Sequence, residues 1–296
     1  MRNKRQRCLY LGPAEDDKVI ELIQRIQEKK KSAQEAKKRA AFFIKLLKGA
    51  GVIPVSGLAE KVLRLLSEEE LIFGNGMLIG TFAFLAYQTK LGFSAWGKAA
   101  RTADVDLLRT EIFVLVNQDL PSLSQSLGSL GEEFFPEGPL TTGIPLRLRH
   151  PAGLTIEVLA TPKAGPPKIV SPPQSGFRDI GAQELARLNF LVEAPFSGFL
   201  VGERSLIPVT IPAPERFAVH KLLVAGLRLE KDLLKALKDI EQAAILIEVL
   251  SARGLKHLLK ERFLEMYQNK KSAKFLEKAL KILAEKHPDT RALLTE

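Results

Sequence analysis

Two acidic side chains, one residue apart, give this chain its clearest chemical signal. They lie in the segment Thr102-Ala103-Asp104-Val105-Asp106-Leu107. Because side chains alternate across a β-strand, Asp104 and Asp106 are expected on one face, about 7 Å apart along the backbone. Like charges held that close repel, and each raises the pKa of the other. A divalent cation between them removes this repulsion, and oxygen-only ligands favour a hard ion such as Mg²⁺ or Mn²⁺.

A short apolar strand, a glycine and an apolar helix precede the acid pair. Gly76–Ile79 is the expected strand and Thr81–Lys90 the expected helix, with the turn at Gly80-Thr81. The first N–H groups of a helix are unpaired and its N-terminal end is positive, so this turn suits an anion. A glycine there lets the backbone approach a phosphate closely. Taken alone, Gly80 would indicate only a tight turn; the acids downstream favour the phosphate interpretation.

A third acid, Glu157, interrupts the otherwise apolar segment Leu154–Leu159. This segment and Ile144–Arg149 are separated by His150-Pro151-Ala152-Gly153, which is typical of a turn. The pattern predicts a β-hairpin whose second strand carries Glu157. A glutamate that simply faces solvent is the alternative.

The order of these features resembles the signature of the polymerase-beta-like nucleotidyltransferase superfamily. That signature is a Gly followed by Gly, Ser or Thr, then an Asp-x-Asp strand, then a third carboxylate on a later strand. The segment Pro214 to Lys221 further resembles the start of the helical part in a little-studied bacterial branch of the superfamily. Two features depart from the pattern: the interval between the glycine and the acid pair is long, and the third acid is Glu where Asp is commoner.

The resemblance implies a metal-dependent enzyme that moves a nucleoside monophosphate from an NTP to a hydroxyl group. It assigns catalysis and the binding of Mg²⁺ (or Mn²⁺) to Asp104, Asp106 and Glu157. It assigns nucleotide binding to Gly80, Thr81 and Lys221. For Lys221, an ordinary lysine on a helix surface is the alternative.

Charge and composition limit the classes of partner that the protein is expected to have. Its 296 residues carry a net charge of +10. The charge is uneven: residues 1–48 carry +8, residues 49–220 carry −3 and residues 221–296 carry +5. Basic ends around a slightly acidic middle suit a polyanion such as RNA, although runs of charge are often only solvated helix faces. A single cysteine excludes an intramolecular disulfide, and neither a signal peptide nor a membrane-length apolar run is visible, so we expect a cytoplasmic protein.

The periodicities predict an α+β fold flanked by N-terminal and C-terminal helical regions, and the resemblance implies a nucleotidyltransferase-type mixed sheet with helices. The expected domains are an N-terminal helical region (1–70), an α/β domain (71–212) and a C-terminal helical domain (213–296). One helix, or two with a break, is expected over residues 16–47, and Asp239 on a later helix is expected to be a surface charge. The remaining strands are predicted at Glu111–Asn117, Ala186–Glu193, Gly198–Val201 and Ser205–Ile211.

Three hypotheses about function follow. The first is the enzyme, with RNA or a protein hydroxyl as acceptor. The second is a non-catalytic nucleic-acid-binding module that retains the nucleotidyltransferase fold, and the third is a helical adaptor between proteins. Other chemistries lack their motifs: the chain has no His/Cys spacing typical of a metal site, no Gly-x-Ser-x-Gly and no Gly-x-x-x-x-Gly-Lys-Ser/Thr.

Overall fold

The computed structural model describes residues 10–13, 15–74, 76–95, 97–100, 102–109, 120–162, 165–172 and 174–295. Its helices are α1 (Asp17–Gly49), α2 (Gly57–Glu68), α3 (Gly80–Leu91), the short 3-10 helix η1 (Gly97–Ala100), α4 (Leu123–Gly128), α5 (Asn189–Val192), α6 (Pro214–Arg228), α7 (Leu233–Ala252), α8 (Lys256–Tyr267), α9 (Lys270–Lys286) and α10 (Pro288–Thr295). Its strands are β1 (Gly76–Ile79), β2 (Asp104–Arg109), β3 (Phe135–Glu137), β4 (Arg147–Arg149), β5 (Thr155–Ala160), β6 (Ile169–Val170), β7 (Ala182–Glu184), β8 (Pro195–Val201) and β9 (Leu206–Pro212).

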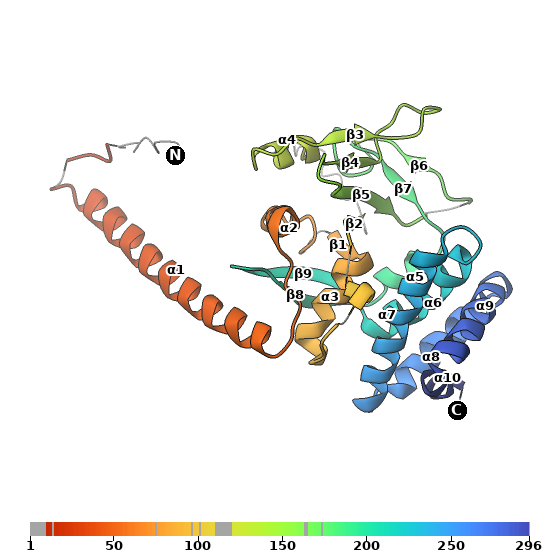
Figure 1. Cartoon of the computed structure of the whole chain (residues 1–296). Helices are drawn as coiled ribbons and strands as arrows, with labels where there is room; N and C mark the ends of the chain where they lie inside the picture. Colours follow the sequence, from red (N-terminus) through yellow and green to blue (C-terminus); the bar gives the residue numbers. More distant parts are fainter. Residues whose placement is uncertain are drawn as a thin grey trace.

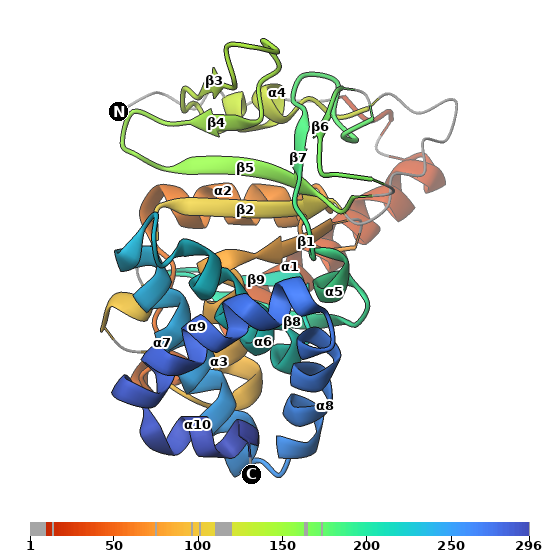
Figure 2. The same ribbon diagram turned by 90° about the vertical axis from the view of Figure 1, so that its right-hand side faces the viewer.

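A mixed β-sheet lies beside a group of helices. The strand order is β1-β2-β5-β4-β3, with β7 pairing with both β5 and β6, and β8 and β9 form a separate hairpin. Strands β2 and β5 are parallel, whereas β1 and β4 run antiparallel to their neighbours β2 and β5. Figure 2 shows β4, β5, β2 and β1 crossing the molecule in that order, with α6 to α10 gathered on one side. The expected α+β fold with a mixed sheet is confirmed.

Helix α3 is the central helix of the core. All of its residues from Thr81 to Gln88 are buried, which is why it is apolar on every side. The Tyr87 hydroxyl donates a hydrogen bond of 2.7 Å to the Pro212 carbonyl, which ties α3 to the end of β9. Gly92 ends the helix in the left-handed conformation, which glycine adopts without steric cost. The apolar run after Ile79 therefore anchors the turn at Gly80.

The C-terminal helices begin with recognisable caps. Pro214 occupies the first turn of α6, where its missing N–H costs nothing. Asp232 accepts a hydrogen bond from the Lys235 backbone at the start of α7, and Asn269 caps α9 in the same way. These caps fix where α7 and α9 begin.

Helix α1 is a single helix without a break, and it projects away from the rest of the molecule (Figure 1). Only Val19 and Ile44 of this helix are buried. Near its C-terminal end it packs through Ile44 against Val52 and Val201. Its lysine clusters are exposed to solvent.

Most of the predicted strands are present. Strands β8 and β9 form the predicted second hairpin, and β4 and β5 form the hairpin that carries Glu157. The strand predicted at Ala186–Glu193 is wrong: β7 ends at Glu184, and residues 189–192 form the short helix α5. A short apolar run fits either period, so its length could not decide between helix and strand. The strand predicted at Glu111–Asn117 lies outside the described residues.

Within the part of the chain that the structure describes, none of the helices combines the length and the apolar character needed to cross a bilayer.

The contact between α6 and α9 gives a first prediction. A Cβ added at Gly226, inside α6, would lie 1.9 Å from the Phe275 carbonyl oxygen of α9. Backbone atoms cannot move aside as a side chain can, so Gly226→Ala should lower the free energy of unfolding by about 2 kcal/mol or more. Urea denaturation measures this. Gly49→Ala, in α1, is the control, because a Cβ there meets nothing within 4 Å. Equal stabilities of the two variants would contradict the packing described.

Candidate active site

The paired strands bring the three predicted acids to one face of the sheet. In the parallel register, Asp106 lies opposite Glu157, and Asp104 lies opposite Thr155. Residues paired in this way point to the same face, and neighbouring strands lie about 4.8 Å apart. Two carboxylates far apart in the sequence are therefore neighbours on adjacent strands.

The turn at Gly80 lies against the same acids. Ile79, the last residue of β1, pairs with Asp106 of β2, so the next residue begins α3 beside that carboxylate. A Cβ on Gly80 would lie 2.0 Å from Asp106 Oδ2, and the residue has a φ of +69°. Both the space and the backbone conformation therefore require glycine here. The N-terminus of α3 and the acid pair belong to one site.

A cavity of about 500 Å³ opens over these residues. One wall carries the acids of β2 and β5; the other consists of α6, α7 and the segment after β7. All six predicted site residues line it: Gly80, Thr81, Asp104, Asp106, Glu157 and Lys221. The structure thus places the predicted residues together, while the roles assigned to them stay predictions.

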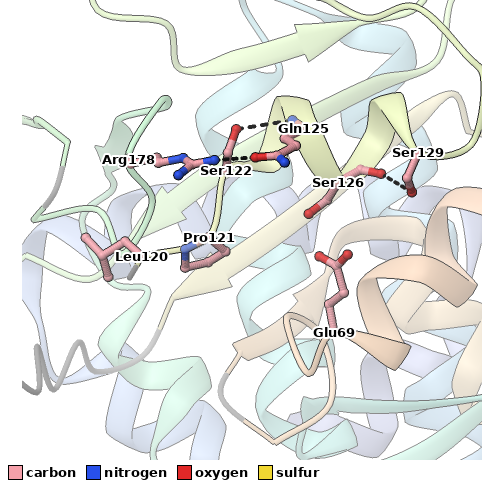
Figure 3. A pocket seen from close by; sticks show the side chains of 8 residues that line it. All are labelled: Glu69, Leu120, Pro121, Ser122, Gln125, Ser126, Ser129 and Arg178. Carbon is pink, nitrogen blue, oxygen red and sulfur yellow. Dashed lines mark hydrogen bonds between the residues drawn. The ribbon is translucent and has the colours of Figure 1, made fainter. Parts of the chain in front are cut away.

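A second pocket, of about 480 Å³, lies beside α4 (Figure 3). Its polar side chains largely bond to one another or to nearby backbone: Arg178 donates to Gln125, and the Ser129 hydroxyl donates to the Ser126 carbonyl. Glu69 is the single acid among its lining residues in the described chain. This pocket lacks the convergent charged groups of a reaction site, so the cavity over the acids is the candidate.

Burial and neighbouring charges raise the proton affinity of both Asp106 and Glu157. Burial, followed by repulsion from Glu157, raises the pKa of Asp106 to about 6. Burial also raises the pKa of Glu157, with a further contribution from Asp104 that nearby Arg147 opposes. Neither Asp106 nor Glu157 forms a hydrogen bond or an ion pair with any other described residue. Their oxygens are therefore available to a ligand.

The side-chain amide of Gln242 orients the Thr81 hydroxyl. Its Oγ1 accepts a hydrogen bond of 3.3 Å from Nε2 of Gln242, a buried residue of α7. The same nitrogen donates to the Ala99 carbonyl at 2.6 Å, so the orientation of the amide is determined. The hydrogen bond from the Gln242 amide uses a lone pair of Thr81 Oγ1. The hydrogen of the Thr81 hydroxyl therefore remains free to donate to a ligand.

Lys221 belongs to a buried ion cluster. Its Nζ lies 2.6 Å from Oδ1 of Asp239, and Arg228 Nη1 lies 2.6 Å from Oδ2 of the same carboxylate. The Asp239 side chain is fully buried, so the expectation that it is a surface charge is wrong. The two cations lower the pKa of Asp239 against the effect of burial. Burial, followed by the Lys221 charge, lowers the pKa of the adjacent His220 to about 3, so this imidazole is neutral at pH 7.

Sequence reasoning missed most of the positive charges in the cavity. They come from three separate parts of the chain: Arg147, Arg187, Arg228, Lys235 and Lys238. Lys235 Nζ lies 3.9 Å from Asp104 Oδ2 and so partly offsets the acid pair. Helical spacing places residues 228, 235 and 239 near one another only once α6 and α7 pack together, which no local pattern shows.

The donor set of the cavity suits a hard cation, although the side chains do not yet enclose one. Carboxylate oxygens are the ligands that Mg²⁺ and Mn²⁺ prefer. In the described chain, no three His, Cys, Asp or Glu side chains are grouped closely enough to hold an ion as they stand. A cation bound between Asp104, Asp106 and Glu157 would offset the repulsion among their charges. The residues therefore fit such an ion by chemistry and by strand position.

The acid-bearing parallel strands beside a glycine-led helix define a nucleotidyltransferase-type arrangement, and the comparison with protein families agrees. A family model described as "Nucleotidyltransferase" matches residues 58–268. Since the match covers well over half of the chain, the protein belongs to this nucleotidyltransferase family, a class of transferases. No curated protein matches the chain.

A solved structure with some likeness is the crystal structure of an antigenic nucleotidyltransferase-like protein from Paracoccidioides brasiliensis. The two chains are 18% identical, with a TM-score of 0.42 over 80% of this chain and 91% of that one.

The raised pKa of Asp106 gives a second prediction. Its pKa is about 6 in the folded protein, above the ordinary aspartate value of 3.8, so folding favours the protonated form. This contribution to stability is present below pH 4 and is lost as the pH rises through 6. Asp106→Asn should therefore be more stable than the wild type at pH 8 in a chelating buffer, by about 3 kcal/mol, and equal to it at pH 4.

Chemical denaturation across this pH range measures the difference. Glu133→Gln is the control, because Glu133 is exposed and does not line the cavity. A stability gap between Asp106→Asn and the wild type that is independent of pH would show that Asp106 is not forced against Glu157.

Proposed function

We propose that the protein is a metal-dependent enzyme that transfers a nucleoside monophosphate from an NTP to a hydroxyl acceptor. The observation that carries the proposal is the pairing of Asp106 with Glu157 beside Gly80, in one cavity of a chain that belongs to the nucleotidyltransferase family. In the reaction the acceptor oxygen forms a bond to the α-phosphorus. The α–β phosphoanhydride bond breaks, and pyrophosphate leaves.

Asp104, Asp106 and Glu157 would hold one or two Mg²⁺ or Mn²⁺ ions, whose positive charge stabilises the transferred phosphate and the leaving group. The chain's own residues supply the rest. Gly80 allows the backbone of the α3 N-terminus to approach the β- and γ-phosphates, and the Thr81 hydroxyl donates to them. Glu157, whose pKa is raised, accepts the proton that the acceptor hydroxyl releases.

Lys221 acts differently from a freely mobile lysine. Its ammonium is fixed by Asp239 at the cavity wall, so it contributes a positioned charge to phosphate binding. Arg228, held by the same carboxylate, adds a second positioned charge. Preorganised charges of this kind cost little to reorganise when substrate binds.

RNA is the acceptor class that the charge distribution favours, and a protein hydroxyl is the next choice. The lysine clusters of α1 are exposed, and residues 221–296, which make up most of the C-terminal helical region, carry a net charge of +5. Phosphate contacts from such clusters are independent of base sequence and weaken with salt. A non-catalytic nucleic-acid-binding module would keep this binding without any need for Mg²⁺.

Incorporation from α-labelled NTPs tests the proposal. The wild type is incubated with each of the four NTPs and Mg²⁺, with a short RNA, a test protein or no added acceptor. We expect incorporation that a chelator abolishes and that Asp106→Asn and Glu157→Gln reduce by about 100-fold or more. Glu133→Gln serves as the matched acidic control and should retain activity.

Equal incorporation by the wild type and Asp106→Asn would remove the site assignment. No incorporation, together with salt-sensitive RNA binding that is independent of Mg²⁺, would establish the non-catalytic module instead.

A further inference from the structure

The positive charges of the cavity are not equivalent. Lys221 and Arg228 are both bonded to Asp239, and Lys235 lies near Asp104. A cation paired with a carboxylate has part of its attraction for a ligand already offset. No ion pair found among the described residues includes Arg147 or Arg187. Arg147 is paired with Glu157 across β4 and β5 and lowers the pKa of that acid, whereas Arg187 has no such neighbouring carboxylate among its contacts in the described chain.

Arg187 is half-buried in the cavity lining, in the segment between β7 and α5. Burial lowers the pKa of its guanidinium. A guanidinium stays charged at any ordinary pH, so this charge is partly removed from water without a carboxylate to offset it. Such a charge is costly unless an anion binds it.

The guanidinium is nevertheless held in a fixed position. Its Nε donates a hydrogen bond of 2.7 Å to Oγ of Ser272, a buried serine in the first turn of α9. Arginine carries five N–H groups, so the four on the two terminal nitrogens remain. The structure records no other hydrogen bond of Arg187 within the described chain. A planar fork anchored at its base suits the oxygens of a phosphate.

The backbone of Arg187 is strained. Its φ is +72°, and among the described residues Glu70 is the single other non-glycine with a positive φ. A residue with a Cβ loses about 1 kcal/mol or more in this conformation, which glycine adopts freely. Backbone geometry alone would favour glycine at position 187. A strained non-glycine residue that also lines a cavity is a candidate for a functional role.

We propose that Arg187 is a phosphate-binding residue of the cavity, and that its ligand is the polyphosphate chain of the nucleoside triphosphate. The ligand's identity rests on the proposed function. The choice of phosphate rests on the anchored, uncompensated guanidinium and on the neighbouring cations of α6 and α7. Ser272 is the positioning residue that orients the fork.

Isothermal titration calorimetry with Mg-ATP, inorganic tripolyphosphate and adenosine tests the assignment. Arg187→Gly and Arg187→Ala should each bind Mg-ATP and tripolyphosphate about 10-fold or more weakly than the wild type. Ser272→Ala should lose a smaller factor, about 3-fold, and should lose nothing further in the Arg187→Gly background, because it acts through the guanidinium. Adenosine binding should not change in any variant.

Stability measurements separate the effect of losing the guanidinium from the effect of relieving the backbone strain. Arg187→Ala keeps a Cβ at the strained φ, so it should be less stable than Arg187→Gly, although both lose affinity equally. Glu70→Gly relieves the same kind of strain outside the cavity and should leave both affinities unchanged.

The outcomes distinguish this inference from the proposed function. Wild-type affinity for tripolyphosphate in Arg187→Gly would overturn the role of Arg187, even where ATP is bound and transferred. Loss of tripolyphosphate binding in Arg187→Gly would support it, even where the wild type transfers no nucleotide. An equal loss of affinity in Glu70→Gly would show a general effect on the fold and would also overturn the assignment.

Discussion

Two carboxylates held side by side on a half-buried face of a sheet are the constraint on which this structure depends. The parallel pairing of β2 and β5 fixes Asp106 opposite Glu157, and neither has a bond to another described residue that would offset the repulsion. A sheet that only needed to fold would not keep this arrangement, because an apolar pair at the same positions would be more stable. Gly80 is part of the same constraint, since any larger residue would collide with Asp106.

Asp239 plays the corresponding part on the opposite wall. One fully buried carboxylate holds a lysine from α6 and an arginine from the end of that helix, and it sits on α7 itself. Its pKa is lowered, so the charge stays in place at neutral pH. Removing one partner from a buried cluster of this kind leaves an unpaired charge, whose cost exceeds the value of any single bond in the cluster. The same ion cluster therefore joins α6 to α7 and positions the charges of the cavity wall.

The sequence predicts one wall of the site well and the other poorly, for a physical reason. Period-two alternation places Asp104 and Asp106 on one face, and a glycine before an apolar helix marks the turn at Gly80, so local patterns suffice. Asp239 looks like any acid on a helix, because its burial depends on Lys221 and Arg228, which reach it only after α6 and α7 pack. The sequence does not mark Arg187 as a cavity residue, because an arginine gives no sign that its backbone φ is positive. The strand predicted at Ala186–Glu193 includes Arg187, whose positive φ does not occur in a strand, and residues 189–192 form α5 instead.

The two walls together set a direction across the cavity. Asp104, Asp106 and Glu157 lie on the strand side, where Arg147 of β4 is paired with Glu157, while most of the positive charges lie on the side of α6, α7 and the segment after β7. A polyphosphate chain is attracted to the second wall, and the carboxylates repel its negative oxygens unless a cation intervenes. A bound triphosphate would therefore orient with its charge-rich end toward Arg187 and the Asp239 cluster. The same opposition of charges that makes the acid pair costly would then also order the substrate.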